Sequence, residues 1–431
     1  MDASILSIFI ISILFGVVTL LLVANELGRR TGLSLPGRFA LMGGLGFGVI
    51  AFTIKAALIV YLGSLDHTDI AALAANYGRA VEARTAPRTP SPQPPSDSAL
   101  WAAWRALPEA APAPRDNPQT ADKVALGRKL FFDASLSLDR TVSCASCHKL
   151  GEGGDDNASV STGISGLTGN RNAPTVLNAA FLTRLFWDGR AASLEDQALG
   201  PFLNLVEMAL PSADALVERV RENSGYRPAF AAVFGGEDPI SARNIVRAIA
   251  AFERTLITPN APYDRYVLGD TNALTAQQRQ GMALFEANGC RTCHLDPLFS
   301  SAGKVKNFGT YRPFPVYPDN DFIGKYDLLV DGKPAIWRVP SLRNVALTGP
   351  YFHNGSVATL EEAVRVMAVS QLNKVLSDDP ADDVTLIADG NGSGEGSGSR
   401  VTVVRDRALS SAEVEAIAAF LRSLSGPLPQ M

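Results

Sequence analysis

The sequence predicts a mainly α-helical protein, in which two tandem and similar domains follow a pair of transmembrane helices. Two long apolar runs open the chain, capped helical segments fill most of the remainder, and one stretch recurs at a fixed spacing. A chain of 431 residues has room for two ordinary domains and additional segments. The net charge of −4 argues against a nucleic-acid-binding protein, because such a surface needs clustered Lys and Arg.

The two apolar runs predict a transmembrane hairpin over residues 1–63. Residues 3–24 carry no charge, and residues 39–62 are interrupted only by Lys55. Because about 20 apolar residues span a bilayer as a helix, each run is long enough to cross. A cleaved signal peptide is the alternative for the first run, but the chain begins with Asp2 and lacks the basic start of such a peptide. The loop between the runs is basic, which places it in the cytoplasm and both termini outside.

Residues 64–118 have the composition of a linker. Nine prolines lie between residues 86 and 118, among Ser, Ala and Gln, which predicts a semi-rigid and extended spacer. Trp101 and Trp104 within this segment indicate a short helix that docks onto the following domains. We expect these two side chains to serve in packing.

Capping residues predict helices in the rest of the chain. Thr or Ser stands at the start of helical segments at 120–132, 275–289 and 410–426, and the last two pair that residue with Gln or Glu three positions later. Residues 384–386 and 401–403 alternate like the strands of a β-hairpin around a Gly/Ser-rich tip.

All four cysteines lie in two C-x-x-C-H motifs. A zinc site, a disulfide and a redox-active cysteine pair are the alternatives, but none of them requires a histidine directly after the second cysteine. In this motif the thiols form thioethers to the haem vinyl groups, and the imidazole becomes the proximal iron ligand. The sequence therefore predicts two covalent haem c groups, and a soluble part in the periplasm of a bacterium with the hairpin in its inner membrane. The residues are Cys144, Cys147 and His148 in the first motif, and Cys290, Cys293 and His294 in the second.

The two motif regions belong to an internal duplication. Residues 174–195 match residues 340–361 without a gap at an offset of 166, with eight identities in 22 positions. The pentapeptide AIAAF also occurs once in each half. We therefore expect two tandem cytochrome c-like haem domains, at 119–265 and 266–431.

The offset reveals a difference between the halves. Met367 falls opposite Pro201, and Met is a good second axial ligand of haem iron whereas Pro cannot ligate at all. The C-terminal haem is then closed by its motif histidine and Met367, as an electron store. The N-terminal haem keeps an open iron with Gln197 and Glu207 near it, which is what peroxide cleavage requires. On periodicity alone, Glu207 is better explained as a surface acid or a helix-end charge.

Several stretches between Thr120 and Ser425 resemble the bacterial dihaem cytochrome c peroxidases, whereas the first 118 residues lie outside the resemblance. It implies a peroxidase that reduces hydrogen peroxide to water. Electrons from a cytochrome c, a cupredoxin or a membrane quinol would enter at the C-terminal haem and pass to the N-terminal one. The matching stretches are 126–133 (LGRKLFFD), 172–175 (NAPT), 186–190 (FWDGR), 338–344 (RVPSLRN), 350–355 (PYFHNG) and 360–364 (LEEAV).

The resemblance also implies roles for individual residues. Met367 matches the distal ligand of the high-potential haem, and Glu207 matches the acid/base above the peroxidatic haem. Trp187 matches a tryptophan between the haems that helps electrons pass, although a core aromatic is its alternative. The peroxidatic pocket would be lined by Gln197, Pro201 and Phe186, a calcium ion would be bound by Asn172, Thr348 and Pro350, and His353 would lie near haem propionates.

One position departs from the family pattern. Many members carry a histidine in a Ser-x-Gly-His loop, where it blocks the peroxidatic iron until reduction releases it. Here the loop ends in Ile164, and the unassigned His67 lies at the membrane end of the linker. We therefore expect an iron that is open to peroxide in the ferric state.

Two other functions remain as alternatives at this stage. A non-enzymatic electron carrier is disfavoured by Glu207 and by the missing second Met. An oxidase of protein side chains, resembling the maturation enzyme of methylamine dehydrogenase, is disfavoured because that enzyme has Tyr where this chain has Met367. A homodimer is compatible with the family.

Overall fold

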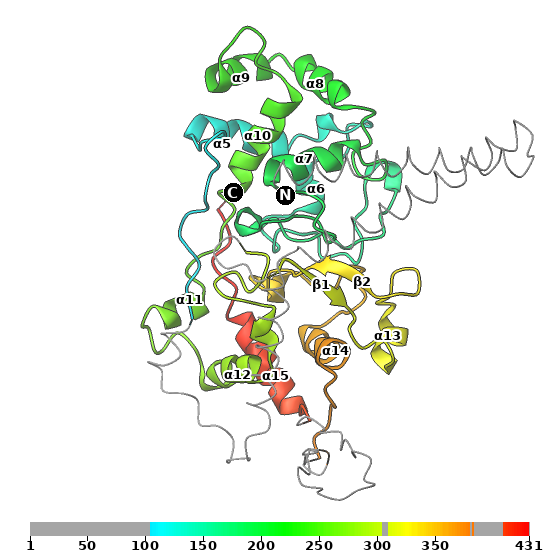
Figure 1. The fold of residues 1–431 in the computed structure, drawn as a ribbon. Helices are drawn as coiled ribbons and strands as arrows, with labels where there is room; N and C mark the ends of the chain where they lie inside the picture. Colours follow the sequence, from blue (N-terminus) through cyan, green and yellow to red (C-terminus); the bar gives the residue numbers. More distant parts are fainter. Residues whose placement is uncertain (1–103, 304–308, 380–381, 383–407, 431) are drawn as a thin grey trace, which may run out of the picture. The chain divides into compact units, whose positions relative to one another are not determined.

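The computed structural model describes residues 104–303, 309–379, 382 and 408–430 (Figure 1). The predicted transmembrane helices, the first part of the linker and the predicted β-hairpin lie outside the described residues. Within the described ranges, no helix combines the length and the hydropathy that a membrane crossing requires.

The N-terminal half is built from helices and short turns, as predicted. In chain order its elements are α5 (Ala121–Phe131), η1 (Ala134–Leu136), α6 (Cys144–Cys147), η2 (Ile164–Gly166), η3 (Ala179–Phe181), α7 (Leu194–Leu203), α8 (Ala213–Glu222), α9 (Tyr226–Phe234) and α10 (Ala242–Glu253).

The C-terminal half repeats this plan and adds a small antiparallel hairpin, in which Tyr311 pairs with Arg338. The mainly α class that the sequence predicts is confirmed. The elements are α11 (Pro262–Val267), α12 (Ala276–Ala287), η4 (Cys290–Thr292), β1 (Tyr311–Phe314), α13 (Asp321–Tyr326), β2 (Ala335–Arg338), η5 (Val345–Leu347), α14 (Leu360–Leu372) and α15 (Ser411–Arg422).

The predicted helix starts are confirmed by their caps. Thr120 accepts a hydrogen bond from the backbone N–H of Lys123, while Thr275 with Gln278 and Ser410 with Glu413 form reciprocal capping boxes. The last helix, α15, ends at Arg422 and not at the predicted stop at Gly426. The reason is tertiary, since the N–H of Gly426 donates to Asn344 Oδ1 and the chain leaves the helix to reach it.

Both halves use the same close crossing of two helices. A Cβ atom added to Gly127 of α5 would lie 1.8 Å from the carbonyl oxygen of Ala248 in α10. A Cβ atom added to Gly281 of α12 would lie 1.8 Å from the carbonyl oxygen of Ala416 in α15. Because no side chain larger than hydrogen fits at either crossing, the glycines set the distance between the helices.

A hydrogen-bonded centre joins the halves. Asn178 and Asn344 both adopt left-handed backbone conformations, with φ of 61° and 59°. Their side-chain amides donate to the same acceptor, Thr258 Oγ1, over 2.8 Å and 2.7 Å. The Oδ1 atom of Asn178 in turn accepts the N–H of Thr258. The two halves therefore meet at a fully hydrogen-bonded buried cluster.

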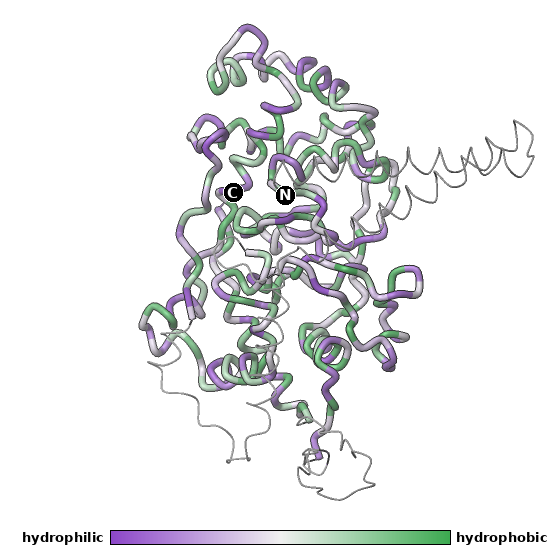
Figure 2. Tube along the Cα trace, viewed as in Figure 1, coloured by the Kyte–Doolittle hydropathy of each residue, from purple (hydrophilic) through white to green (hydrophobic). Residues whose placement is uncertain are grey.

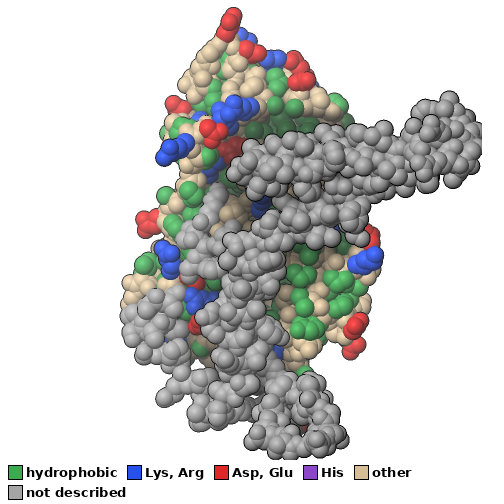
Figure 3. Space-filling view, viewed as in Figure 1, with side chains coloured by type: hydrophobic (Ala, Val, Ile, Leu, Met, Phe, Trp, Pro, Cys, Tyr) green, Lys and Arg blue, Asp and Glu red, His purple; other side chains and the backbone are tan. Residues whose placement is uncertain are grey.

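Each half has its own hydrophobic core. Helix α10 places Ile245, Ile249 and Phe252 in the N-terminal core, together with the small buried residues between them. Figure 2 shows hydrophobic and hydrophilic stretches interspersed along the trace. The exposed surface over α8 carries charges of both signs, and Arg221 pairs there with Glu218 (Figure 3).

The end of the linker packs against the C-terminal core. Trp104 is 3% exposed and its ring makes an edge contact with that of Tyr263, at 6.0 Å between centroids. The expected packing role of Trp104 is confirmed. The helix predicted around it is wrong for the described residues, because residues 104–118 form no helix and Pro108, Pro112 and Pro114 interrupt helical hydrogen bonding.

Candidate haem centres

The second C-x-x-C-H motif presents a neutral imidazole. Gly289, in a left-handed conformation, ends the preceding helix and turns the chain into η4, which carries Cys290. Nδ1 of His294 lies 3.0 Å from the carbonyl oxygen of Phe299, so Nδ1–H donates and Nε2 is left to bind a metal. Burial lowers the pKa of His294 to about 4, which keeps the ring neutral.

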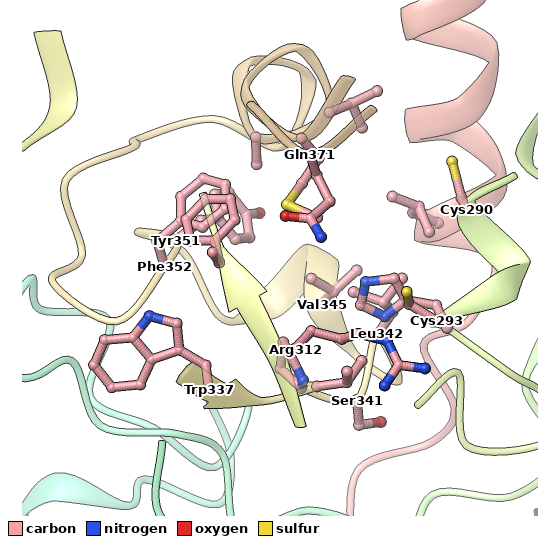
Figure 4. Close-up of a pocket in the computed structure, with 18 of the residues that line it drawn as sticks. Cys290, Cys293, Arg312, Trp337, Ser341, Leu342, Val345, Tyr351, Phe352 and Gln371 are labelled. Carbon is pink, nitrogen blue, oxygen red and sulfur yellow. The ribbon is translucent and has the colours of Figure 1, made fainter. Parts of the chain in front are cut away.

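A mainly apolar cavity of about 250 Å³ lies beside this motif. Cys290 and Cys293 line one end of it, and Gln371 reaches in from α14 (Figure 4). The residues that line the cavity also include His294 from the motif and Met367 from α14. The structure therefore brings together all four residues that were predicted for the C-terminal haem.

This cavity fits a haem c. Its walls are apolar, two thiols stand side by side at one end, and a neutral imidazole and a thioether line the same space. Cys290 and Cys293 would hold the group through thioethers, and His294 and Met367 would be its axial ligands. Two further atoms support a ligand in the cavity: Gln371 Oε1 and Trp337 Nε1 are buried without a hydrogen-bond partner.

The first motif repeats the arrangement in the N-terminal half. Helix α6 carries Cys144 and Cys147, and Nδ1 of His148 lies 3.1 Å from the carbonyl oxygen of Gly154. Burial lowers the pKa of His148, so this imidazole is also held in the neutral form that binds iron. The N-terminal core packs around Cys144.

Glu207 lies close to the first motif. Burial raises its pKa, while the charge of Arg190 and a hydrogen bond of 2.5 Å from Asn204 Nδ2 partly offset that effect. The charge of Glu207 in turn contributes to the raised pKa of Cys144 and Cys147. The half-buried Glu207 therefore lies near the first motif, which does not fit the alternative of a remote surface acid.

The other residues predicted for this pocket lie on or against α7. Gln197 and Pro201 are one helical turn apart in that helix. Phe186 has a φ of 64° and packs on α7, since a Cβ atom added to Gly200 would lie 3.0 Å from its ring. The guanidinium of Arg190 lies 3.5 Å from the centroid of that ring.

Two partners of Glu207 were missed by sequence reasoning. Asn204 carries no sequence signal that distinguishes it from other loop amides. Arg190 belongs to the FWDGR stretch, which was used only as a family signature. Its position three residues after Trp187 could have drawn attention to it.

Ile164 lies beside Glu207. It is 6% exposed, and its N–H donates to the backbone carbonyl of Glu207 over 3.0 Å. The loop is fixed in place, because a Cβ atom added to Gly163 would lie 1.9 Å from the carbonyl oxygen of Val206. Met208 is buried in the same core at 3% exposure. His67 lies outside the described residues.

The residues predicted between the haems also meet. Trp187 Nε1 donates to the carbonyl oxygen of Asn172 over 2.8 Å, and the N–H of Asn172 donates to the carbonyl oxygen of His353. Asn172, Thr348 and Pro350 all line the cavity of the C-terminal half. In the described ranges, no cluster of three or more His, Cys, Asp or Glu is arranged to hold a metal ion. A cation here would depend on amide and carbonyl oxygens.

His353 and Trp337 form a stacked pair on the wall of the same cavity. Their ring centroids are 4.5 Å apart at an interplanar angle of 23°. Burial first, and the charge of Arg171 second, lower the pKa of His353 to about 4. Sequence reasoning missed Trp337, because a single tryptophan in a short strand gives no functional signal.

Comparisons with known proteins agree with this geometry. The sequence pattern of a family described as di-haem cytochrome c peroxidase matches residues 121–272. Cytochrome c peroxidase Ccp of Escherichia coli is 43% identical over 281 residues, which cover 63% of this chain and 58% of the relative. Cytochrome c551 peroxidase of Pseudomonas aeruginosa is 37% identical over 343 residues, covering 77% of this chain and 86% of the relative.

A solved structure shares the fold. A MauG-like protein associated with microbial copper homeostasis superposes with a TM-score of 0.58 at 30% identity, covering 74% of this chain and 95% of that one. The family implies two haem c groups. From its sequence relatives and its two haem motifs, the chain belongs to the dihaem cytochrome c peroxidase family of oxidoreductases.

Proposed function

We propose that this chain reduces hydrogen peroxide to water, with electrons that enter at the C-terminal haem and pass to the N-terminal one. Family membership supports a peroxidase. The proposed direction of electron transfer rests on a difference between the equivalent helices α7 and α14. Met367 of α14 lines the cavity that also holds His294, whereas α7 has Pro201 at the matching position.

The C-terminal half acts as the electron store in this proposal. His294 and Met367 would close both axial positions, and a thioether ligand raises the reduction potential of a haem. The donor would be a small cytochrome c, a cupredoxin or a membrane quinol. The membrane hairpin of residues 1–63 would hold the catalytic domains at the periplasmic face, which cell fractionation with an epitope tag would test.

The N-terminal half carries out the chemistry. A haem held by Cys144 and Cys147 would supply the iron at which the O–O bond is cleaved. Glu207 would take a proton from one oxygen of the peroxide and return it to the other, which leaves as water. Two electrons and two further protons complete the reduction of peroxide to two waters. A pKa raised by burial suits this exchange, because a group that titrates closer to the working pH transfers protons more readily in both directions.

The neighbours of Glu207 orient the reaction. Asn204 holds one carboxylate oxygen, which leaves the other for the substrate. The positive charge of Arg190 opposes the effect of burial, so that the carboxylate form stays accessible. Gln197 lies on the same helix as Pro201 and would hydrogen-bond the peroxide.

A calcium ion between the halves is part of the proposal. The side-chain oxygen of Asn172 and the carbonyl oxygens of Thr348 and Pro350 are the hard ligands that this ion prefers. Treatment of the protein with a calcium chelator should lower its melting temperature, and added calcium should restore it. Metal analysis that finds no calcium, with a melting temperature that the chelator leaves unchanged, would contradict the site.

Ile164 supports an iron that is ready in the oxidised state. The side chain offers no lone pair to a metal, and its backbone is hydrogen-bonded to Glu207. The as-isolated ferric protein should show a high-spin signal and react promptly with peroxide. A purely low-spin spectrum that becomes active only after one-electron reduction would show that another group, such as Met208, closes the site.

The decisive experiment is a turnover assay of the purified full-length protein with hydrogen peroxide and a reduced small cytochrome. Saturable oxidation of the cytochrome, two molecules for each peroxide, is expected. Electron exchange with the cytochrome without peroxide consumption would identify a carrier. Oxidation of protein side chains is the second candidate, since a MauG-like structure shares the fold, but Met367 stands where that maturation enzyme has Tyr.

A further inference from the structure

We propose that Trp337 is a second electron-relay residue, which connects the C-terminal haem cavity to Trp187. This inference rests on the proposed direction of electron flow, and it adds a residue that no family signature in the sequence includes. A single electron passes through the pair, no bond to Trp337 forms or breaks, and the indole ends in the oxidation state in which it began.

Trp337 is in contact with Trp187. The two ring centroids are 6.5 Å apart at an interplanar angle of 81°, which is an edge-to-face arrangement. Strand β2 fixes this contact through its backbone, because the N–H of Arg338 donates to the carbonyl oxygen of Trp187 over 2.9 Å. The Arg338 side chain adds a second bond, from Nε to the carbonyl oxygen of Phe186. The pair is therefore held by the hairpin and not by ring packing alone.

Trp337 also faces the cavity. It is 8% exposed, it lines the cavity, and its Nε1–H is buried without a hydrogen-bond partner. A buried donor that stays unpaired destabilises the protein, so this group is suited to an acceptor on a bound molecule. In Figure 4, Trp337 lies at the opposite end of the cavity from Cys290 and Cys293.

The polarity of haem matches this placement. The vinyl groups that form thioethers and the propionate carboxylates lie on opposite edges of the porphyrin. If the vinyl edge is held at Cys290 and Cys293, the propionate edge would face the end of the cavity where Trp337 lies. The indole N–H would donate to a propionate, which places the ring of Trp337 against the porphyrin edge on one side and against Trp187 on the other.

The neighbours of Trp337 decide how it carries the electron. His353 stacks on its ring at 4.5 Å, and the guanidinium of Arg171 lies 5.0 Å from the ring centroid. A positive charge over the ring disfavours an indole cation radical by electrostatic repulsion. Trp337 therefore serves as a bridge for tunnelling, and no radical should accumulate on it.

The test measures electron exchange between the haems without peroxide. In the full-length holoprotein, carbon monoxide is bound at the open N-terminal haem, the C-terminal haem is oxidised, and a laser flash releases the carbon monoxide. The electron then moves between the haems at a rate that their visible bands report. Trp337→Leu should slow this exchange by about tenfold or more. Trp337→Phe keeps a ring but loses the N–H, and should lie between Leu and the wild type.

A matched control is available in Trp104. Its Nε1 is also buried without a partner, but it packs in the C-terminal core and does not line the cavity. Trp104→Phe should leave the exchange rate unchanged. Redox titration of each variant measures the haem potentials, so that an effect of a changed driving force on the exchange rate can be separated from an effect of the lost bridge.

The outcomes separate this inference from the proposed function. An exchange rate that is unaffected in Trp337→Leu and Trp337→Phe, but slowed in Trp187→Leu, would overturn the role of Trp337 while peroxide turnover persists. Absence of turnover in the wild type would overturn the peroxidase proposal and leave the exchange measurement valid. A tryptophan radical at Trp337 in the electron paramagnetic resonance spectrum would contradict tunnelling through an unoxidised indole, because it would show that Trp337 itself loses an electron.

Discussion

The two haem halves share one frame and differ at a few positions inside it. Each half crosses two helices over a glycine, at Gly127 and at Gly281, and each fixes its motif histidine through a backbone carbonyl. The equivalent helices α7 and α14 start 166 residues apart. In this shared frame, Pro201 takes the place of Met367. On the proposed function, this difference of one axial side chain within a shared frame would separate an electron store from a reactive site.

Removal of one haem attachment should have the largest effect. Cys144→Ala should leave the C-terminal haem as the single covalent one, and Cys290→Ala should leave the N-terminal haem, because all four cysteines lie in the two motifs. Intact mass and acid-acetone extraction measure the covalent haem. Wild-type haem that is released by extraction would show that the attachment is not covalent, and would remove the basis of the comparison.

Glu207→Gln should be next in size. The variant should retain both haems and lose peroxide turnover by about 10²- to 10⁴-fold, because the amide cannot exchange the proton. Asp214→Asn, on the exposed start of α8, is a matched control that removes an acid from the same half. Near-normal turnover in Glu207→Gln would return this residue to a surface role.

The pH dependence of peroxide turnover gives a second test of Glu207. Burial raises the pKa of Glu207 above its ordinary value of 4.5, and the carboxylate must be deprotonated to accept the first proton. Activity should therefore fall as the pH drops through the raised pKa, at a higher pH than an exposed glutamate would give. The Gln variant should lose this acid limb in a pH profile of kcat/KM.

Met367→His should lower the potential of the C-terminal haem, because replacing a thioether by an imidazole favours the ferric state. The reduction potential of the N-terminal haem should remain unchanged. A redox titration that shows no change at either haem would mean that another residue is the ligand, and the asymmetry with Pro201 would lose its meaning.

The smallest effect on activity should come from the helix crossings. Gly127→Ala and Gly281→Ala should each lower the free energy of unfolding by about 1–3 kcal/mol, as overpacking does in other proteins. Gly151→Ala is a fitting control, because a Cβ atom there would meet nothing within 4 Å. Urea unfolding measures all three. Clearly unequal losses in the two crossing variants would show that the halves have diverged in packing as well as in chemistry.

Local and repeated features of this fold were predictable from sequence. Thr120, Thr275 and Ser410 begin helices through hydrogen bonds to residues three positions away, which a sequence pattern contains. Met367 could be singled out because the duplication supplied Pro201 as its counterpart. The surroundings of Trp104 were not predictable in the same way, because its ring packs against Tyr263, which lies 159 positions away in the sequence.

Contacts between distant segments account for the rest. Trp337 meets Trp187 across 150 positions of sequence, and the charge of Arg190 reaches Glu207 from a separate turn. Neither pair has a spacing that a periodic pattern could reveal. The predicted hairpin at 384–403 and the transmembrane helices at 3–24 and 39–62 stay predictions, since they lie outside the described residues.

Thr258 makes one half of the molecule depend on the other. Its buried hydroxyl is the acceptor for one asparagine from each half, although Thr258 itself belongs to the N-terminal half. Asn344 of the C-terminal half therefore takes its acceptor from the N-terminal half. A C-terminal half that lacked residue 258 would leave this buried amide without its partner, whereas Asn178 would keep its own.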